Sequence, residues 1–160
     1  MLKVNLPKVT ALDSTTFNGC NKLTSINLPS VKTIGASNFE SCWNLRELYM
    51  PALETITSWG WNFNACGLRR VYFPKLTNFT SNDLAGCGEL ATLILGADTV
   101  CALPAANFLN ATPINSKTGY VYVPSALVSQ YQSDQYWSQY ASQIRAIEDY
   151  PEVLEGWESE

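Results

Sequence analysis

This 160-residue chain contains no histidine, so the candidates for catalysis or metal binding are five cysteines and fourteen scattered acids. Histidine is the commonest general base and metal ligand, so its absence argues against both kinds of site. The cysteines form no CxxC pair of the kind that binds zinc, and no two acids are placed by their spacing as an acid/base couple. The sequence therefore predicts a protein that is not an enzyme and has no cofactor or metal.

The cysteines belong instead to a repeat. Pro7, Pro29, Pro51 and Pro74 recur at spacings of 22, 22 and 23 residues, and an apolar pair two residues apart precedes each proline. These pairs are Val4/Leu6, Ile26/Leu28, Leu48/Met50 and Val71/Phe73, and they continue at Leu93/Leu95 and Val121/Val123. Further columns hold Phe17, Phe39, Phe63, Leu84 and Phe108, then Cys20, Cys42, Cys66 and Cys87, then Leu23, Leu45, Leu68 and Leu90.

An apolar pair at i and i+2 is the period of a strand with one buried face, and a proline ends such a strand. A unit of about 22 residues cannot bury its apolar face alone, but stacked copies can. The spacing therefore predicts a parallel sheet along one side of a coil, with irregular or short helical returns and rungs about 5 Å apart.

The pattern Leu-x-x-Ile-x-Leu-Pro-x-Val-x-x-Ile followed by Phe-x-x-Cys-x-x-Leu is clearest from Leu23 to Leu45. It resembles the BspA-like leucine-rich repeats of bacterial surface proteins. The resemblance implies an α/β solenoid, a right-handed coil over residues 1–124 that serves adhesion or recognition. In that family the cysteine column holds a small apolar residue facing the core, so free, buried thiols are expected; disulfides between adjacent rungs are the alternative.

Residues 125–150 resemble the helical C-terminal cap of such arrays in bacterial and prophage-encoded proteins. We expect a helix over 126–132 with Ser125 as its N-cap, and a second short helix from about Gln135 with Trp137, Tyr140 and Ile144 on one side. Such a cap covers core and strand edge. No equivalent precedes Val4, so we expect a bare N-terminal edge and a fragment of a longer protein.

Charge is uneven along the chain. Residues 134–160 carry seven acids and one base, a net charge of −6, whereas residues 1–133 carry nine bases and seven acids, a net charge of +2. Without a basic stripe the chain is not expected to bind nucleic acid. Residues 151–160 are predicted to be a solvated acidic tail. No apolar run is long enough to span a membrane and no signal peptide opens the chain, so membrane insertion is not expected.

The candidate binding face consists of residues that the sheet points outward. They are Glu47, Tyr49, Arg70, Tyr72, Ile94, Tyr120 and Tyr122, with Glu47 and Arg70 on adjacent strands. Tyrosine and arginine are frequent at interface hot spots, and tyrosine offers a large, rigid surface with a polar tip. The alternative is that these tyrosines are ordinary strand residues that pair with their neighbours.

A secondary candidate is the longer return of the third repeat, which carries Trp59 and Trp61 around Gly60. Insertions in solenoids often bulge at binding faces, where two tryptophans could stack on a sugar ring. Alternatively they fold back over the coil, or one pairs with Trp43.

Together these features predict a non-enzymatic binding or adhesion module of a bacterial or phage-derived surface protein. It would recognise a protein or glycan through the sheet face, and it would be extracellular if it is part of an exported protein. The alternative is a structural spacer or assembly segment, whose N-terminal edge joins further repeats of the same polypeptide.

Overall fold

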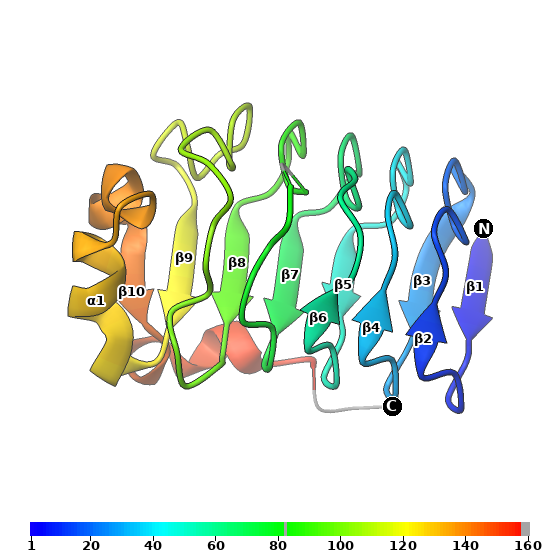
Figure 1. Ribbon diagram of the computed structural model, residues 1–160, viewed down its shortest axis with the longest axis horizontal. Helices are drawn as coiled ribbons and strands as arrows, with labels where there is room; N and C mark the ends of the chain where they lie inside the picture. The colour runs from blue at the N-terminus through cyan, green and yellow to red at the C-terminus, as the bar shows by residue number, and fades with distance from the viewer. Residues whose placement is uncertain (82, 158–160) are drawn as a thin grey trace.

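In the computed structural model, which describes residues 1–81 and 83–157, the chain winds into a coil of stacked repeats (Figure 1). Strands β1 (Leu2–Asn5) and β3 (Leu23–Asn27) form a parallel pair. Five more strands form a second parallel sheet in the order β10-β9-β8-β7-β5: β5 (Glu47–Tyr49), β7 (Arg70–Phe73), β8 (Thr92–Leu95), β9 (Tyr120–Val123) and β10 (Ile144–Ala146). The predicted solenoid with a parallel sheet on one face is confirmed.

The returns differ from the prediction of irregular or short helical segments. In the first three repeats they contain two-residue strands, β2 (Ala11–Leu12), β4 (Thr33–Ile34) and β6 (Thr55–Ile56), which form a third parallel sheet. Each pair ends in a buried aliphatic residue, and the Thr-Ile pairs of β4 and β6 are β-branched, which suits a pleated ladder. The coil is therefore closed by strands on two sides over this stretch.

The core consists of the repeat columns stacked on themselves. Phe17, Phe39 and Phe63 stack with ring centroids 5.6 and 5.7 Å apart, close to the spacing between rungs. Each aromatic ring thus packs against its equivalents in the neighbouring repeats. The apolar side chains of one repeat are buried by those of the next, as expected for a solenoid.

The backbone of the returns is held by a ladder of buried amide and carboxylate side chains that the sequence analysis missed. The Oδ1 atom of Asn38 accepts from the Thr16 N–H at 3.2 Å, and that of Asn62 accepts from the Asn38 N–H at 3.0 Å. Asp83 ends the series, where its Oδ1 accepts from the Asn62 N–H at 3.1 Å. These residues each precede the phenylalanine column by one position, a spacing that could have revealed them.

The cysteine column makes polar contacts as well as packing in the core. The thiols of Cys42, Cys66 and Cys87 each donate to the carbonyl of the column phenylalanine in the preceding repeat, at 3.2, 2.6 and 2.8 Å. All five cysteines are free. Four are buried, whereas Cys20 in the first repeat is half-buried. Burial raises the pKa of Cys87 to about 12, so its thiol stays protonated and able to donate.

The C-terminal cap contains short helices: a 3-10 turn η1 (Ser125–Leu127), α1 (Val128–Ser133) and a 3-10 helix η2 (Trp137–Gln143). Ser125 lies inside the first turn and provides no side-chain cap, contrary to the expectation. Ile144 was expected on the second helix, but it begins β10, which pairs with β9. An apolar residue at i and i+2, Ile144 and Ala146, reproduces the strand signal of the repeats in a segment that we interpreted as helical.

The aromatic residues of the cap replace the missing next repeat. The indole N–H of Trp137 donates to the Cys101 carbonyl at 2.6 Å, and the Cys101 N–H donates to the Tyr131 hydroxyl at 2.8 Å. The Tyr140 hydroxyl accepts from the Leu109 N–H at 3.2 Å. Buried backbone groups need such partners, so the cap satisfies the last returns as well as covering them.

Removing the last acceptor of the ladder is expected to destabilise the fold. The substitution Asp83→Ala leaves the buried Asn62 N–H unpaired and should lower the free energy of unfolding by about 2 kcal/mol. Asp83→Asn keeps an acceptor oxygen and matches Asn38 and Asn62. Urea unfolding monitored by circular dichroism measures both, and equal losses would contradict the ladder.

The difference in the free energy of unfolding between the parent and Asp83→Asn is expected to depend on pH. Burial raises the pKa of the Asp83 carboxyl in the folded protein above its ordinary value of 3.8. The stability that the protonated carboxyl contributes is therefore fully present below pH 3.8 and is lost as the pH rises through the pKa of the folded state. The parent should lose stability relative to Asp83→Asn as pH increases across the weakly acidic range. A difference that is constant with pH, or that grows in the parent's favour, would contradict this.

Thiol labelling tests the cysteine column. At mildly alkaline pH an aromatic disulfide reagent should modify Cys20 rapidly and the other four only after denaturation, because they are buried. Cys20→Ser should remove the rapid phase. A second rapidly reacting thiol in native protein would show that the column opens.

Candidate functional site

The seven candidate residues of the sheet face come from β5, β7, β8 and β9. Glu47, Arg70 and Tyr120 lie in one outward column, which continues through Thr92. Tyr49, Tyr72, Ile94 and Tyr122 lie in the adjacent column, also in register. The structure therefore brings all seven onto one face of one sheet.

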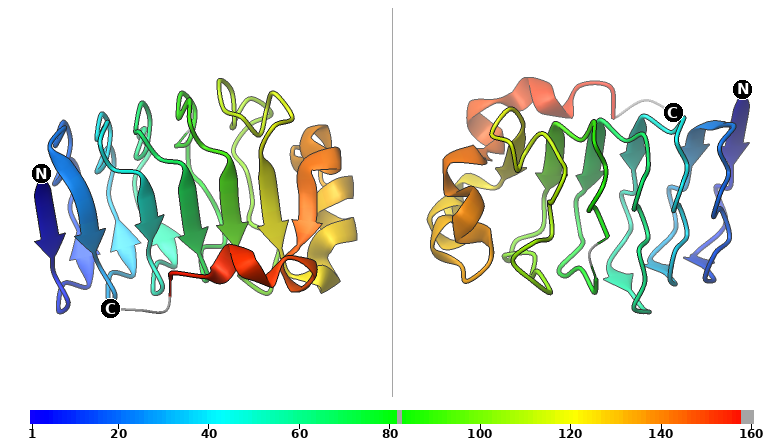
Figure 2. Two further views of the ribbon diagram at one scale, coloured as in Figure 1. Left: turned by 180° about the vertical axis from the view of Figure 1, so that it is seen from behind. Right: turned by 90° about the horizontal axis from the view of Figure 1, so that it is seen from above.

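That face is covered in part by the end of the chain. Residues 147–157, here called the C-terminal segment, contain two 3-10 turns, η3 (Ile147–Asp149) and η4 (Pro151–Leu154). The left view of Figure 2 shows this segment crossing in front of β9, β8 and β7. Ile94 and Tyr122 are buried beneath it, and Trp157 is only 8% exposed.

The expectation of a solvated tail over 151–160 is wrong for residues 151–157; residues 158–160 lie outside the described residues. The physical reason lies in the spacing of Tyr150, Val153, Leu154 and Trp157, which places their side chains on one side of a helical turn. They pack on Ile94 and Tyr122 in an apolar cluster separate from the main core. Glu152 and Glu155 remain exposed, so acidic composition concealed an amphipathic segment.

Arg70 is the polar anchor of this contact. Its guanidinium donates to the carbonyls of Val153 and Glu155 at 3.2 and 3.0 Å, and to the Glu47 carboxylate at 3.1 Å. It also lies 4.5 Å from the ring centroid of Trp157. One side chain therefore binds the backbone of the segment and the face of its aromatic residue at once.

The aromatic contact around Trp157 is built from two repeats. Tyr49 and Tyr72 stack with centroids 5.2 Å apart, and the indole of Trp157 lies 5.6 and 6.2 Å from them. The indole N–H donates to the Val153 carbonyl at 3.0 Å, which holds the ring against its own turn. The tyrosines thus pair across strands, as the alternative interpretation had it, and also support a third ring.

A second cation anchors the start of the segment. The guanidinium of Arg145 lies 3.4 Å from the ring centroid of Tyr120 and 4.7 Å from that of Tyr150, and Tyr150 meets Tyr122 edge-on at 5.7 Å. Burial raises the pKa of Tyr122, while Arg145 acts in the opposite direction. The pKa of Glu148 is lowered, first by a backbone hydrogen bond within its own residue and then by the Ser125 N–H.

Beside Trp157 the sheet face carries an open groove with a volume of about 530 Å³. It lies over β3 and β5, strands that neighbour each other in Figure 1 but belong to separate sheets. The lining consists of polar and aromatic residues of both strands and the end of the segment. These residues are Thr24, Ser25, Ile26, Asn27, Pro29, Arg46, Glu47, Tyr49, Pro51, Gly156 and Trp157.

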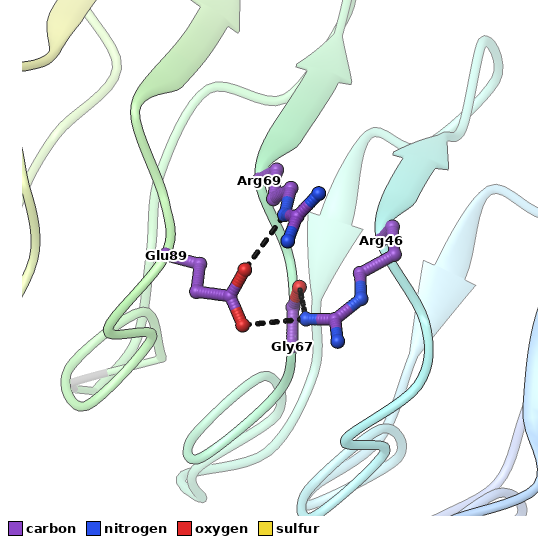
Figure 3. A network of polar contacts seen from close by, with 4 residues as sticks. All are labelled: Arg46, Gly67, Arg69 and Glu89. Carbon is purple, nitrogen blue, oxygen red and sulfur yellow. Dashed lines mark hydrogen bonds and ion pairs between the residues drawn. The ribbon is translucent and has the colours of Figure 1, made fainter.

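One edge of the groove is fixed by the charged network shown in Figure 3. Arg46, which lines the groove, donates to the Gly67 carbonyl at 3.1 Å and to Glu89 at 2.7 Å, while Arg69 donates to the other Glu89 oxygen at 2.6 Å. The hydrogen bonds from Arg69 and Arg46 lower the pKa of Glu89. A side chain at Gly67 would collide with the Trp43 carbonyl, so only glycine allows this close approach.

The secondary candidates lie apart from this site. Trp59 and Trp61 are 80% and 51% exposed, so they do not fold back over the coil. Gly60 between them packs tightly on Ala36 of the preceding repeat. Within the described residues neither ring contacts that of Trp43, which is itself 58% exposed. They remain available at the surface.

The groove offers hydrogen-bonding and aromatic groups to a ligand. Across residues 1–81 and 83–157 no cluster of three or more histidine, cysteine or acidic residues could hold a metal ion. The buried carboxylate, Asp83, is used by the ladder. No helix in the same ranges has the length and hydropathy to cross a membrane. Hydrogen-bonding and aromatic groups dominate the groove.

Comparison with known proteins agrees with the repeat pattern. The family model described as the BspA type leucine rich repeat region matches residues 1–115 in six copies. No curated protein matches the chain significantly.

Loss of Trp157 is expected to release the C-terminal segment. In Trp157→Ala the aromatic contact with Tyr49 and Tyr72 and the Arg70 stacking disappear together. Proteolysis after Glu152 and Glu155 by a glutamate-specific protease should accelerate about tenfold, which corresponds to roughly 1.4 kcal/mol of local opening. Trp59→Ala, a change at an exposed tryptophan, is the control; equal acceleration in both variants would contradict this docking.

Proposed function

Because the chain belongs to the BspA-type leucine-rich-repeat family, we propose that it is a non-enzymatic recognition module that binds a protein ligand through the open groove on its sheet face. The family consists of repeat modules suited to protein interaction and is typically non-catalytic. The observation that carries the proposal is the groove itself, the part of the outward face over β3 and β5 beside the C-terminal segment.

The groove has the size and chemistry of a recognition site. Pockets for small molecules commonly measure about 300–1,000 Å³, and this groove lies within that range, so it has room for one or two side chains of a protein ligand. Ser25 and Asn27 offer hydroxyl and amide groups, Glu47 offers a carboxylate, and Tyr49 and Trp157 supply aromatic surface. Aromatic anchors combined with adaptable polar groups are typical of protein-binding surfaces.

We further propose that this binding serves adhesion in a bacterial or phage-derived surface protein. BspA-type repeat proteins are often associated with surfaces, which supports this setting. The paired strands of the sheet support it too, because a prearranged face loses little conformational freedom when it binds. The exposed Trp59 and Trp61 would act as a secondary contact.

The test fills the groove without disturbing the core. Ser25 is exposed on β3, so Ser25→Arg should leave the fold intact, which circular dichroism checks, while its side chain occupies the groove. Thr10→Arg adds the same charge at an exposed position outside the groove and is the matched control. On an array of immobilised proteins and glycans the parent and control should bind a protein that Ser25→Arg binds at least tenfold more weakly.

Other outcomes have defined meanings. Binding that survives Ser25→Arg would move the site away from the groove, to Trp59 and Trp61 or the cap. Retention of glycans instead of proteins would change the ligand class.

A structural role is the second candidate, and the first repeat favours it. Leu2 is exposed, and Val4, Leu6 and Val9 are only half-buried. Stacking of further repeats on this edge would bury them. Concentration-dependent self-association, lost on changing Leu2 and Val4 to serine, would support an assembly element, whereas a parent that binds nothing on the array would weaken the recognition proposal.

A further inference from the structure

The C-terminal segment meets the sheet face in the manner of a bound peptide. Arg70 reaches from β7 to two backbone carbonyls of the segment, and these bonds depend on the segment's conformation, not on its side chains. Trp157 then packs beside Arg70 against the paired tyrosines. Hydrogen bonds from a charged donor are stronger than neutral ones, and tryptophan and arginine are frequent at interface hot spots, so this contact has the elements of a binding site for a peptide.

Charge also distinguishes the segment from the surface that receives it. Residues 147–157 carry four acids and no base, whereas the sheet face contacts them through Arg70 and Arg145. The acidic side chains themselves stay exposed or at the margin, so the attraction favours approach and orientation more than it contributes buried ion pairs.

The attachment is local. The cluster beneath the segment is separate from the main core of the solenoid, and the segment follows β10 directly, after the last strand of the sheet. Its release therefore exposes one small cluster and leaves the repeats and cap intact. Elements held in this way open with a free energy well below that of global unfolding.

We propose that the face over β7, β8 and β9 is a peptide-binding site that the chain's own residues 147–157 occupy, and that an acidic, tryptophan-bearing segment of a partner protein binds there in their place. This goes beyond the proposed function, which concerns the open groove over β3 and β5. The tethered segment acts at an effective concentration in the millimolar range, so a partner of modest affinity binds only when its local concentration is high or the tether is weakened.

The experiment uses the full chain with a weakened segment. A fluorescein-labelled synthetic peptide of residues 147–157 is titrated with the parent, with Trp157→Ala and with Gly156→Pro, and fluorescence anisotropy is measured. Gly156 has φ +84°, a conformation that proline cannot adopt, so its substitution misplaces Trp157 without touching the core. Both variants should bind the peptide at least tenfold more tightly than the parent.

Two controls locate the site. Adding Arg70→Gln to Trp157→Ala should weaken peptide binding at least tenfold, and a peptide with alanine in place of tryptophan should bind as weakly. Adding Ser25→Arg to Trp157→Ala should weaken peptide binding far less than Arg70→Gln does, because Ser25 lies in the groove that Trp157 borders and not beneath the segment. This separates the inference from the proposed function.

Three results would overturn the proposal. Both variants could fold yet bind the peptide no more tightly than the parent does. Alternatively, Ser25→Arg could weaken peptide binding as much as Arg70→Gln does, which would place the peptide in the groove. Loss of the folded state in both variants would show that the segment is part of the core and does not exchange.

Discussion

The structure depends on one constraint: no repeat buries its apolar side chains or pairs its buried polar groups without its neighbours. The Phe column packs on its equivalents, and the thiols of Cys42, Cys66 and Cys87 donate to a carbonyl of the previous repeat. Asn38, Asn62 and Asp83 each accept from a backbone N–H one repeat earlier. Apolar burial and buried hydrogen bonds therefore share the same register, so a slip of one residue would lose both. This explains why the repeat length is held so closely through the first four copies.

The same constraint dictates the two ends of the array. At the C-terminal end, Tyr131, Trp137 and Tyr140 supply hydrogen-bonding groups to the backbone of the last returns, where another repeat would have done so. The cap is aromatic because long, rigid side chains with a polar tip can cover a core and reach a backbone N–H or carbonyl at once. At the other end Phe17 and Cys20 are only half-buried, since no equivalent cover lies on the first repeat among the described residues.

Much of this architecture could be predicted from spacing alone, because a solenoid converts a one-dimensional period into position. The strands, the outward columns and the pairing of Glu47 with Arg70 all follow from a 22-residue register. Prediction failed where the strand signal, an apolar pair followed by proline, was absent. Ile144 and Ala146 form a strand that no proline marks, and β4 and β6 are too short for a pattern. Asp83 was not singled out, because its buried role depends on Asn62 in the preceding repeat.

The C-terminal segment shows why composition misled us most at the candidate site. Four acids suggested solvent, but the spacing from Tyr150 to Trp157 decides where the chain lies, since burial of several large apolar groups outweighs the solvation of charges that never leave the surface. The consequence for function is a shared residue. Trp157 packs over Tyr49 and Tyr72 and also lines the open groove, so groove and covered face are not independent. A ligand that uses the indole as part of its binding surface would favour the closed segment, whereas one that needs the tyrosines beneath it must displace it. The sign of the coupling between the two sites is thus set by which side of one ring the ligand contacts.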